Sequence, residues 1–351
     1  MFIFLILGIA LLIYLELKIP QSLIRGLKYK ASIDKILYEP GEEIVLRSEV
    51  YNYNKSFVPF VRLREYIPAQ ALLDDDGRGV YYAENWVTVE RKVPIRARER
   101  LTKNEVFTIN SRGRYSFGEY KLGVGDIFGW NETEILGKGP HSFAVMPERS
   151  RNADLSAIVS GFIGDISVMR FIMEDPILTV GFGDYTGREP MKDISWMRTA
   201  MAGRLLVKKY DYTGDINVTV LLNCDGDDNE DLEECFRITR MVVEKLEVAH
   251  IPYAFKTNGF LFGPVSHVTY VPKGLGEAHL REILYGLSTA IYDRMSSFTT
   301  LVDDVLDKRE QNENYMVITR ELDAAGHAAL RKLQRSCDGK IGIIVGKEAK
   351  R

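Results

Sequence analysis

The sequence has few of the residues that metal, redox and hydrolytic sites require. It contains three cysteines and five histidines, with no CxxC pair, no HExxH motif and no two histidines four residues apart. This argues against a zinc site, and the odd number of thiols favours a reducing compartment over a disulfide framework. Walker A and GxSxG motifs are also absent, which argues against P-loop nucleotide hydrolysis and α/β-hydrolase chemistry.

An excess of charge of one sign is lacking as well. Lysine and arginine number 46 and aspartate and glutamate 49, which leaves a formal net charge of -3. Binding to a phosphate backbone needs a basic excess, so we expect no nucleic acid among the partners. What the chain does have is 46% hydrophobic residues over 351 positions, which is enough for packed cores in about two domains.

A run of apolar residues opens the chain and carries no charge from Phe2 to Leu15. With its continuation to Ile19 it approaches the ~20 residues of a membrane span, so we predict a transmembrane anchor over residues 1–19. Basic side chains occur only from Lys18 onwards. This predicts a single-pass cell-membrane protein that contacts the lipid bilayer and has its body in the cytoplasm. A cleaved signal peptide and a buried core helix are the alternatives, but no basic start or small-residue cleavage site is present.

Residues 31–147 alternate apolar and polar side chains in short segments separated by turn clusters. The alternation is clear from Ile44 to Val50, and turn residues gather at 52–54 and 111–114. Several short strands at this spacing predict an antiparallel β-sandwich. Arginines recur at every second position at Arg96, Arg98 and Arg100, so we expect them on one strand face. That face is either solvated or an anion-binding strip.

Residues 148–351 are the expected second domain, and from residue 217 its pattern alternates between strand and helix. We predict strands at 217–222, 252–256, 268–271, 315–318 and 340–345, and helices at 231–249, 277–292, 296–307 and 324–335. Strands that alternate with helices indicate a largely parallel, doubly wound sheet. Ligands of such sheets bind beyond the carboxyl ends of the strands, which here points to the acidic turn after Leu222.

The segment 185–207 carries the most specific pattern in the chain. It resembles the signature of the domain-of-unknown-function 58 family, approximately Tyr-x-x-Gly-Asp-x-x-Arg-x-Ile-x-Trp-x-x-x-Ala. The positions that match are Tyr185, Ile194, Trp196 and Ala200. Arg188-Glu189 stands where the family has Gly-Asp, and Lys192 stands where it has Arg. Residues 112–115 and 125–129 resemble two further family segments, so the likeness extends over nearly the whole chain.

The resemblance implies both a fold and a role. The expected fold class is α+β multidomain, with an N-terminal transmembrane helix, an antiparallel β-sandwich and a von Willebrand factor A-like doubly wound α/β domain. The expected role is that of a non-enzymatic, membrane-tethered accessory protein, a partner of a MoxR-type AAA+ ATPase in envelope-related assembly. A scaffold whose β-domain binds a membrane protein is an alternative.

The signature segment supplies the candidate partner-binding residues. Its polar side chains form either a docking surface or a solvated face, whereas Tyr185 and Trp196 are expected to pack in a core. The candidate set is Tyr185, Gly187, Lys192, Asp193, Trp196, Arg198 and Arg204.

A second candidate site follows from the same resemblance. Von Willebrand factor A domains often bind Mg²⁺ through Asp-x-Ser-x-Ser, and the matching place here has Asn223, Asp225 and Asp227. All three are oxygen ligands suited to Mg²⁺ or Ca²⁺, the candidate cofactors. The turn also resembles the start of an EF-hand loop, but the glycine that such a loop requires is absent. The simpler interpretation is an acidic helix N-terminus that binds no metal. A divalent-metal-dependent hydrolase that uses the turn at 223–228 is the alternative function, although no general base is evident nearby.

Overall fold

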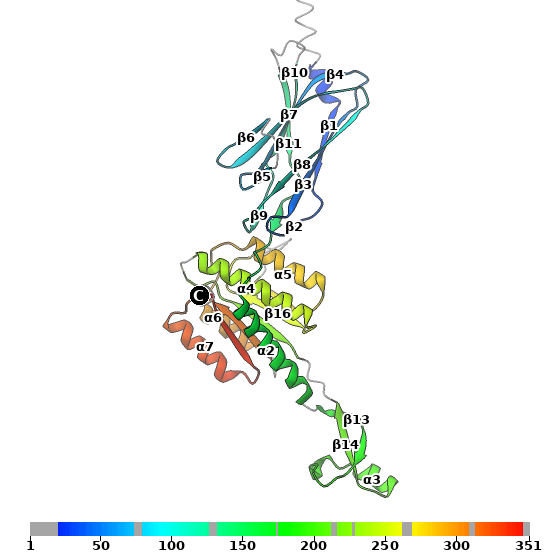
Figure 1. Ribbon diagram of the computed structural model, residues 1–351, viewed down its shortest axis with the longest axis vertical. Helices are drawn as coiled ribbons and strands as arrows, with labels where there is room; N and C mark the ends of the chain where they lie inside the picture. The colour runs from blue at the N-terminus through cyan, green and yellow to red at the C-terminus, as the bar shows by residue number, and fades with distance from the viewer. Residues whose placement is uncertain are drawn as a thin grey trace, which may run out of the picture. The chain divides into compact units, whose positions relative to one another are not determined.

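A computed structural model describes residues 20–73, 79–125, 132–172, 175–211, 216–226, 229–261, 269–308 and 313–346 (Figure 1). The chain divides into two compact units, residues 1–148 and residues 149–351. The division lies within one residue of the expected start of the second domain.

Two antiparallel sheets pack face to face in the first unit. One has the strand order β1 (Leu27–Ser32), β3 (Glu43–Asn52), β8 (Arg100–Thr108) and β5 (Leu72–Leu73). The other has the order β11 (Glu132–Lys138), β10 (Glu119–Gly125), β4 (Val58–Pro68), β7 (Trp86–Ile95) and β6 (Val80–Tyr82). A third, small sheet contains β2 (Leu37–Tyr38), β12 (Phe143–Val145) and β9 (Gly113–Tyr115), and its β2 and β12 are parallel.

The alternation in the sequence places the core of this unit between the two large sheets. Ile44 of β3 and Phe107 of β8 share one buried cluster with Ile67 of β4 and Val87 of β7. Polar side chains are buried in this unit too: Glu65 of β4 accepts hydrogen bonds from the hydroxyl groups of Tyr29 and Ser48 on the opposite sheet.

A five-stranded sheet forms the centre of the second unit. Its order is β17 (Tyr270–Gly274), β16 (Tyr253–Thr257), β15 (Val218–Leu222), β18 (Asn314–Thr319) and β19 (Ile341–Val345). All neighbours are parallel except β17, which is antiparallel to β16. All five residues of β15 are buried, as expected for a strand covered on both faces.

The helices of this unit cover the sheet. Residues of α6 (Phe298–Asp307) and α7 (Ala324–Ser336) share a buried cluster with Leu221, Tyr315 and Val317 of the sheet. Helix α4 (Asn229–Val248) contacts β15 and β18, and it also contacts α2 (Ala153–Ile172) and α5 (Glu277–Thr289). The ranges predicted for these strands and for α4 to α7 agree with the structure to within about three residues, whereas α2 was not predicted.

A separate two-stranded hairpin is inserted between α2 and β15. It consists of β13 (Asp175–Asp184), the 3-10 turn η1 (Met191–Asp193), α3 (Trp196–Ala202) and β14 (Leu206–Asp211). β13 and β14 are antiparallel and, within the described ranges, pair with no other strand. Residues 175–211 are called the hairpin below.

The expectation of a transmembrane helix is corrected. The segment on which it rests, residues 1–19, lies outside the described residues, and no helix within the described ranges is long and apolar enough to cross a membrane. The long helix α2, for example, contains Asp154, Asp165 and Arg170. Over the described residues the fold class is a β-rich α+β arrangement, without a helix that could serve as the predicted membrane element. The single-pass membrane placement that depended on this element is wrong on the same finding.

The arginine strip is corrected as well. β7 ends at Ile95 and β8 begins at Arg100, so Arg96 and Arg98 lie in the turn between the two strands. The backbone of Arg98 has a φ of 60°, which is the left-handed conformation typical of turns. The three side chains therefore do not share a strand face. The period of two arose from a turn that divides two strands.

Candidate functional site

The signature segment forms the closed end of the hairpin. The backbone N–H of Tyr185 donates to the carbonyl of Leu205 at 3.0 Å, and the N–H of Ser195 donates to the carbonyl of Leu206 at 2.8 Å. Helix α3 ends at Ala202 and is capped by Gly203, whose φ of 67° is a left-handed conformation that glycine adopts without strain. The side chain of Thr199 accepts from the N–H of Leu206 at 2.9 Å, so α3 is tied back onto β14.

Large apolar side chains on this closed end face solvent. Trp196, Met197 and Met201 are 62%, 76% and 77% exposed, and Met191 and Leu205 are exposed too. Buried hydrophobic residues here are few: Ile194 and Val207, which also form a β-bridge. Trp196 was expected in a core, and this expectation is wrong because α3 is a short helix with no buried residue.

Basic side chains surround the apolar ones. Lys192 and Arg198 are exposed, and the guanidinium of Arg198 lies 5.1 Å from the centre of the Phe182 ring. Arg204 is exposed and lies 3.3 Å from the carboxylate of Asp184. Of the remaining candidates, Tyr185 and Asp193 are half-buried, and Gly187 has a φ of 88° in a turn. The structure thus places the candidate residues of this segment together on the hairpin.

Phe182, Met191, Met197, Met201 and Leu205 were missed as candidates because they carry no chemistry of their own. A signal was nevertheless present, since three of the ten methionines of the chain occur between positions 191 and 201. Methionine is flexible and polarizable, and it is frequent at adaptable binding surfaces.

The second candidate site lies at the point where the strand order of the central sheet reverses. β15 and β18 are adjacent there, and the chain leaves their carboxyl ends at Asn223 and Arg320. The neighbouring strand β16 is followed by Asn258. In open α/β sheets this crevice is the usual ligand position.

The side chains in this crevice are hydrogen-bonded to one another. Oδ1 of Asn223 accepts from the N–H of Asp225 at 3.0 Å and from Nδ2 of Asn258 at 3.0 Å. Nδ2 of Asn223 donates to the hydroxyl of Thr319 at 2.9 Å. Nη2 of Arg320 donates to the backbone carbonyl of Cys224 at 3.2 Å.

Asp225 has protein partners on both carboxylate oxygens. Oδ1 accepts from Nδ2 of Asn258 at 2.8 Å and lies 3.2 Å from Nη1 of Arg294. Oδ2 accepts from the backbone N–H of Phe298 at 2.8 Å. Asn258, Arg294 and Phe298 were not predicted as site residues, because they lie on other segments and only the sheet topology brings them here.

This donor set fits a carboxylate neutralised by the protein rather than an open cation site. A divalent ion at Asp225 would compete with the guanidinium of Arg294. Asp227, the third predicted ligand, lies outside the described residues. Within the described ranges no group of three or more His, Cys, Asp or Glu side chains is placed to hold a metal ion. A Mg²⁺ or Ca²⁺ site at Asn223, Asp225 and Asp227 stays a prediction.

Comparisons with known proteins add little. No family model and no curated protein matches the chain. Among solved structures, the CARDB domain of a Pyrococcus furiosus protein is 13% identical, over 34% of this chain and 91% of that one, with a TM-score of 0.23. The sporulation control protein Spo0M of Bacillus subtilis is 16% identical, over 39% of this chain and 55% of its own length, with a TM-score of 0.21. Likenesses at these TM-scores support no argument about fold or function.

Proposed function

We propose that this protein is a non-catalytic interaction module that docks a protein partner through the hairpin. The docking residues are called the hairpin surface and comprise Phe182, Met191, Trp196, Met197, Met201 and Leu205, with Lys192 and Arg198 beside them. The observation that supports this proposal is the exposure of six large apolar side chains on one hairpin.

Exposed apolar side chains scattered singly over a protein need no explanation, but a concentration of them does. Here the tryptophan and two of the methionines belong to one helix of 7 residues, α3. Tryptophan, methionine and arginine are enriched in the centres of protein interfaces, and tryptophan and arginine dominate binding hot spots. The composition of the hairpin surface is therefore that of an interface centre.

The charges around the hairpin surface indicate the chemistry of the partner. Arg204 is partly neutralised by Asp184, whereas Lys192 and Arg198 are exposed cations beside apolar side chains. Complementary charge steers association, so an apolar pocket with an acidic rim is the surface that fits. A MoxR-type AAA+ ATPase is the partner class that the family resemblance suggests, and we propose it here.

The hydrolase hypothesis has no comparable support. It requires Asp225 to activate a metal-bound water, but this carboxylate accepts hydrogen bonds from Asn258 and from the backbone N–H of Phe298. Its remaining neighbour is a guanidinium, that of Arg294. The arrangement holds two loops together and positions no general base.

The proposal is tested by measuring binding of the full chain to a purified MoxR-type AAA+ ATPase from the same organism. Met197→Asp in the hairpin surface should weaken binding by about 2 kcal/mol or more, the size of a hot-spot effect. Arg198→Glu should slow association and make it less sensitive to salt. Val248→Asp is the matched control, because Val248 is equally exposed at the end of α4.

The melting temperature of each variant separates binding from folding, since exposed positions change stability by only about 0.5 kcal/mol. Weaker capture by both hairpin variants with unchanged melting supports the proposal. Equal capture by Met197→Asp, Val248→Asp and the unchanged chain would refute it.

A further inference from the structure

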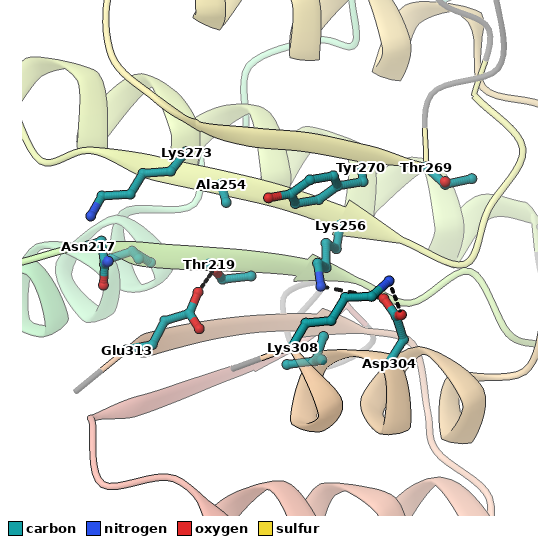
Figure 2. Close-up of a pocket in the computed structure, with 12 residues that line it drawn as sticks. Asn217, Thr219, Ala254, Lys256, Thr269, Tyr270, Lys273, Asp304, Lys308 and Glu313 are labelled. Atoms are coloured by element: carbon teal, nitrogen blue, oxygen red, sulfur yellow. Dashed lines mark hydrogen bonds and ion pairs between the residues drawn. The ribbon is translucent and has the colours of Figure 1, made fainter. Parts of the chain in front are cut away.

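A pocket of about 280 Å³ lies beside α6, on one face of the central sheet (Figure 2). Thr219 of β15, Lys256 of β16 and Tyr270 of β17 come from three neighbouring strands, and Asp304 and Lys308 come from the end of α6. None of these residues belongs to the hairpin surface or to the crevice after β15. The pocket is therefore separate from both candidate sites.

A lysine in β16 is the first unusual feature of the pocket. β16 lies between β15 and β17, and the other four of its residues are buried. Interior strands of a sheet covered by helices are expected to be apolar, so Lys256 breaks the pattern. Such local violations are expected at functional sites rather than in the supporting core. The side chain of Lys256 is only 13% exposed, so most of it is removed from water.

Two ammonium groups share a single carboxylate in this pocket. Nζ of Lys308 lies 2.5 Å from one oxygen of Asp304, and Nζ of Lys256 lies 3.5 Å from the other. Hydrogen bonding from Lys308, and then the charge of Lys256, holds the pKa of Asp304 below its ordinary value. The two ammonium groups and the one carboxylate together carry a net charge of one positive unit. Figure 2 shows the two lysines converging on Asp304.

An aromatic ring lies within reach of this cationic group. Nζ of Lys256 is 5.1 Å from the centre of the Tyr270 ring. The second carboxylate of the pocket, that of Glu313, is engaged elsewhere: it accepts from the hydroxyl of Tyr315 at 2.7 Å and from that of Thr219. Those hydroxyls do not neutralise Glu313, but Lys273 also lines the pocket, so three lysines and two carboxylates leave it with a net positive charge.

We propose that this pocket binds a small organic anion. A carboxylate or a phosphate monoester group binds Lys256 and Lys308, and the apolar part of the ligand lies against Tyr270 and Ala254. The ammonium groups supply charge-assisted hydrogen bonds, and the ring supplies apolar contact. This inference goes beyond the proposed docking function and does not depend on it.

Benzoate and phenyl phosphate are suitable probes, because each joins a ring to one of the two anionic groups. Saturation-transfer NMR with the full chain should detect binding of at least one of them. Tighter binding of phenyl phosphate shows that the pocket prefers a phosphate monoester, and tighter binding of benzoate shows that it prefers a carboxylate. Either result supports the proposal.

Three variants test the residues. Lys308→Met and Lys256→Met should each weaken probe binding about tenfold, the contribution of one hydrogen bond to a charged group. Asp304→Asn should strengthen binding, because it removes the carboxylate that competes with the ligand. Lys332→Met is the matched control: Lys332 lies 2.7 Å from Asp303, the residue next to Asp304, and is not among the pocket residues.

The exposed position of Lys308 keeps the test independent of folding, since its replacement leaves the core untouched. Circular dichroism of each variant verifies this. The absence of binding of both probes to the unchanged chain and to Asp304→Asn would overturn the proposal. Equal binding by Lys308→Met and Lys332→Met would overturn it as well.

Discussion

The hairpin and the crevice after β15 depart from the usual distribution of side chains in opposite directions. In the crevice, Asn223 and Asn258 are polar and buried. On the hairpin, Trp196, Met197 and Met201 are apolar and exposed. Both arrangements would be unfavourable in isolation, because buried polar groups need hydrogen-bond partners and apolar surface is driven away from water.

The two regions differ in where their partners lie. In the crevice the amide groups of Asn223 and Asn258 and the carboxylate of Asp225 satisfy one another within the chain. On the hairpin, the described residues provide no buried cluster that includes Trp196 or the methionines. A buried polar group with its partners in place indicates structure. A concentrated apolar surface that no described residue covers supports the docking that we propose.

The largest expected effect compares two aromatic residues. Phe236 of α4 is 0% exposed, and Phe236→Ala should lower the free energy of unfolding by about 3–5 kcal/mol through loss of burial and formation of a cavity. Trp196→Ala should change it by no more than about 0.5 kcal/mol, because the side chain already faces water. Urea denaturation measures both. A large loss of stability in Trp196→Ala would show that the hairpin surface is covered within the molecule.

A smaller effect is expected in the crevice. Asn223→Ala removes the partner of the Asp225 N–H, of the Asn258 amide and of the Thr319 hydroxyl. Each buried group left unsatisfied costs about 1–3 kcal/mol, so we expect a loss of roughly 3 kcal/mol in unfolding free energy. Asn229→Ala, at an exposed position of α4, is the control and should be nearly neutral. Equal stability of the two variants would mean that the crevice network does not hold these loops.

The smallest expected effect is a pH dependence, and it contrasts two glutamates. Burial raises the pKa of Glu65 between the two sheets, while the hydroxyl of Thr186 lowers the pKa of Glu189 on the hairpin. Glu65 keeps its proton to higher pH in the folded chain, so its contribution to stability is complete below its ordinary pKa of 4.5 and is lost as pH rises through the folded pKa. Glu189 has the opposite sign, with its contribution present above its ordinary pKa and lost as pH falls.

Urea denaturation across acidic and neutral pH measures this difference. Glu65→Gln should remove the loss of stability that accompanies rising pH, because glutamine does not ionise. Glu189→Gln should leave that loss in place. If Glu65→Gln showed the same slope as the unchanged chain, the ionisation of Glu65 would not be its source.

Much of the central sheet follows from local sequence patterns. The apolar run before Asn223 sufficed to locate β15, and the helical spacing from Leu232 to Leu246 sufficed to locate α4. The hairpin was not predicted, because its segments are too short to show the period of two residues of a strand or the period of about 3.6 residues of a helix. The prediction that Arg96, Arg98 and Arg100 share a strand face was wrong, because a turn lies between the two strands although the arginines recur at every second position. The membrane helix predicted over residues 1–19 rested on hydropathy alone, and no described helix supports it.

The sequence by itself determined which segments form strands and helices in the central sheet, because periods of two and of about 3.6 are set by local backbone geometry. Only the tertiary structure decided that Asp225 meets Asn258, 33 positions away, and Phe298, 73 positions away. The exposure of Trp196 and the position of Lys256, Asp304 and Lys308 around one pocket also follow only from the tertiary structure. Such contacts depend on which strands pair and which helices pack between them, and that choice is made by the free energy of the whole folded chain.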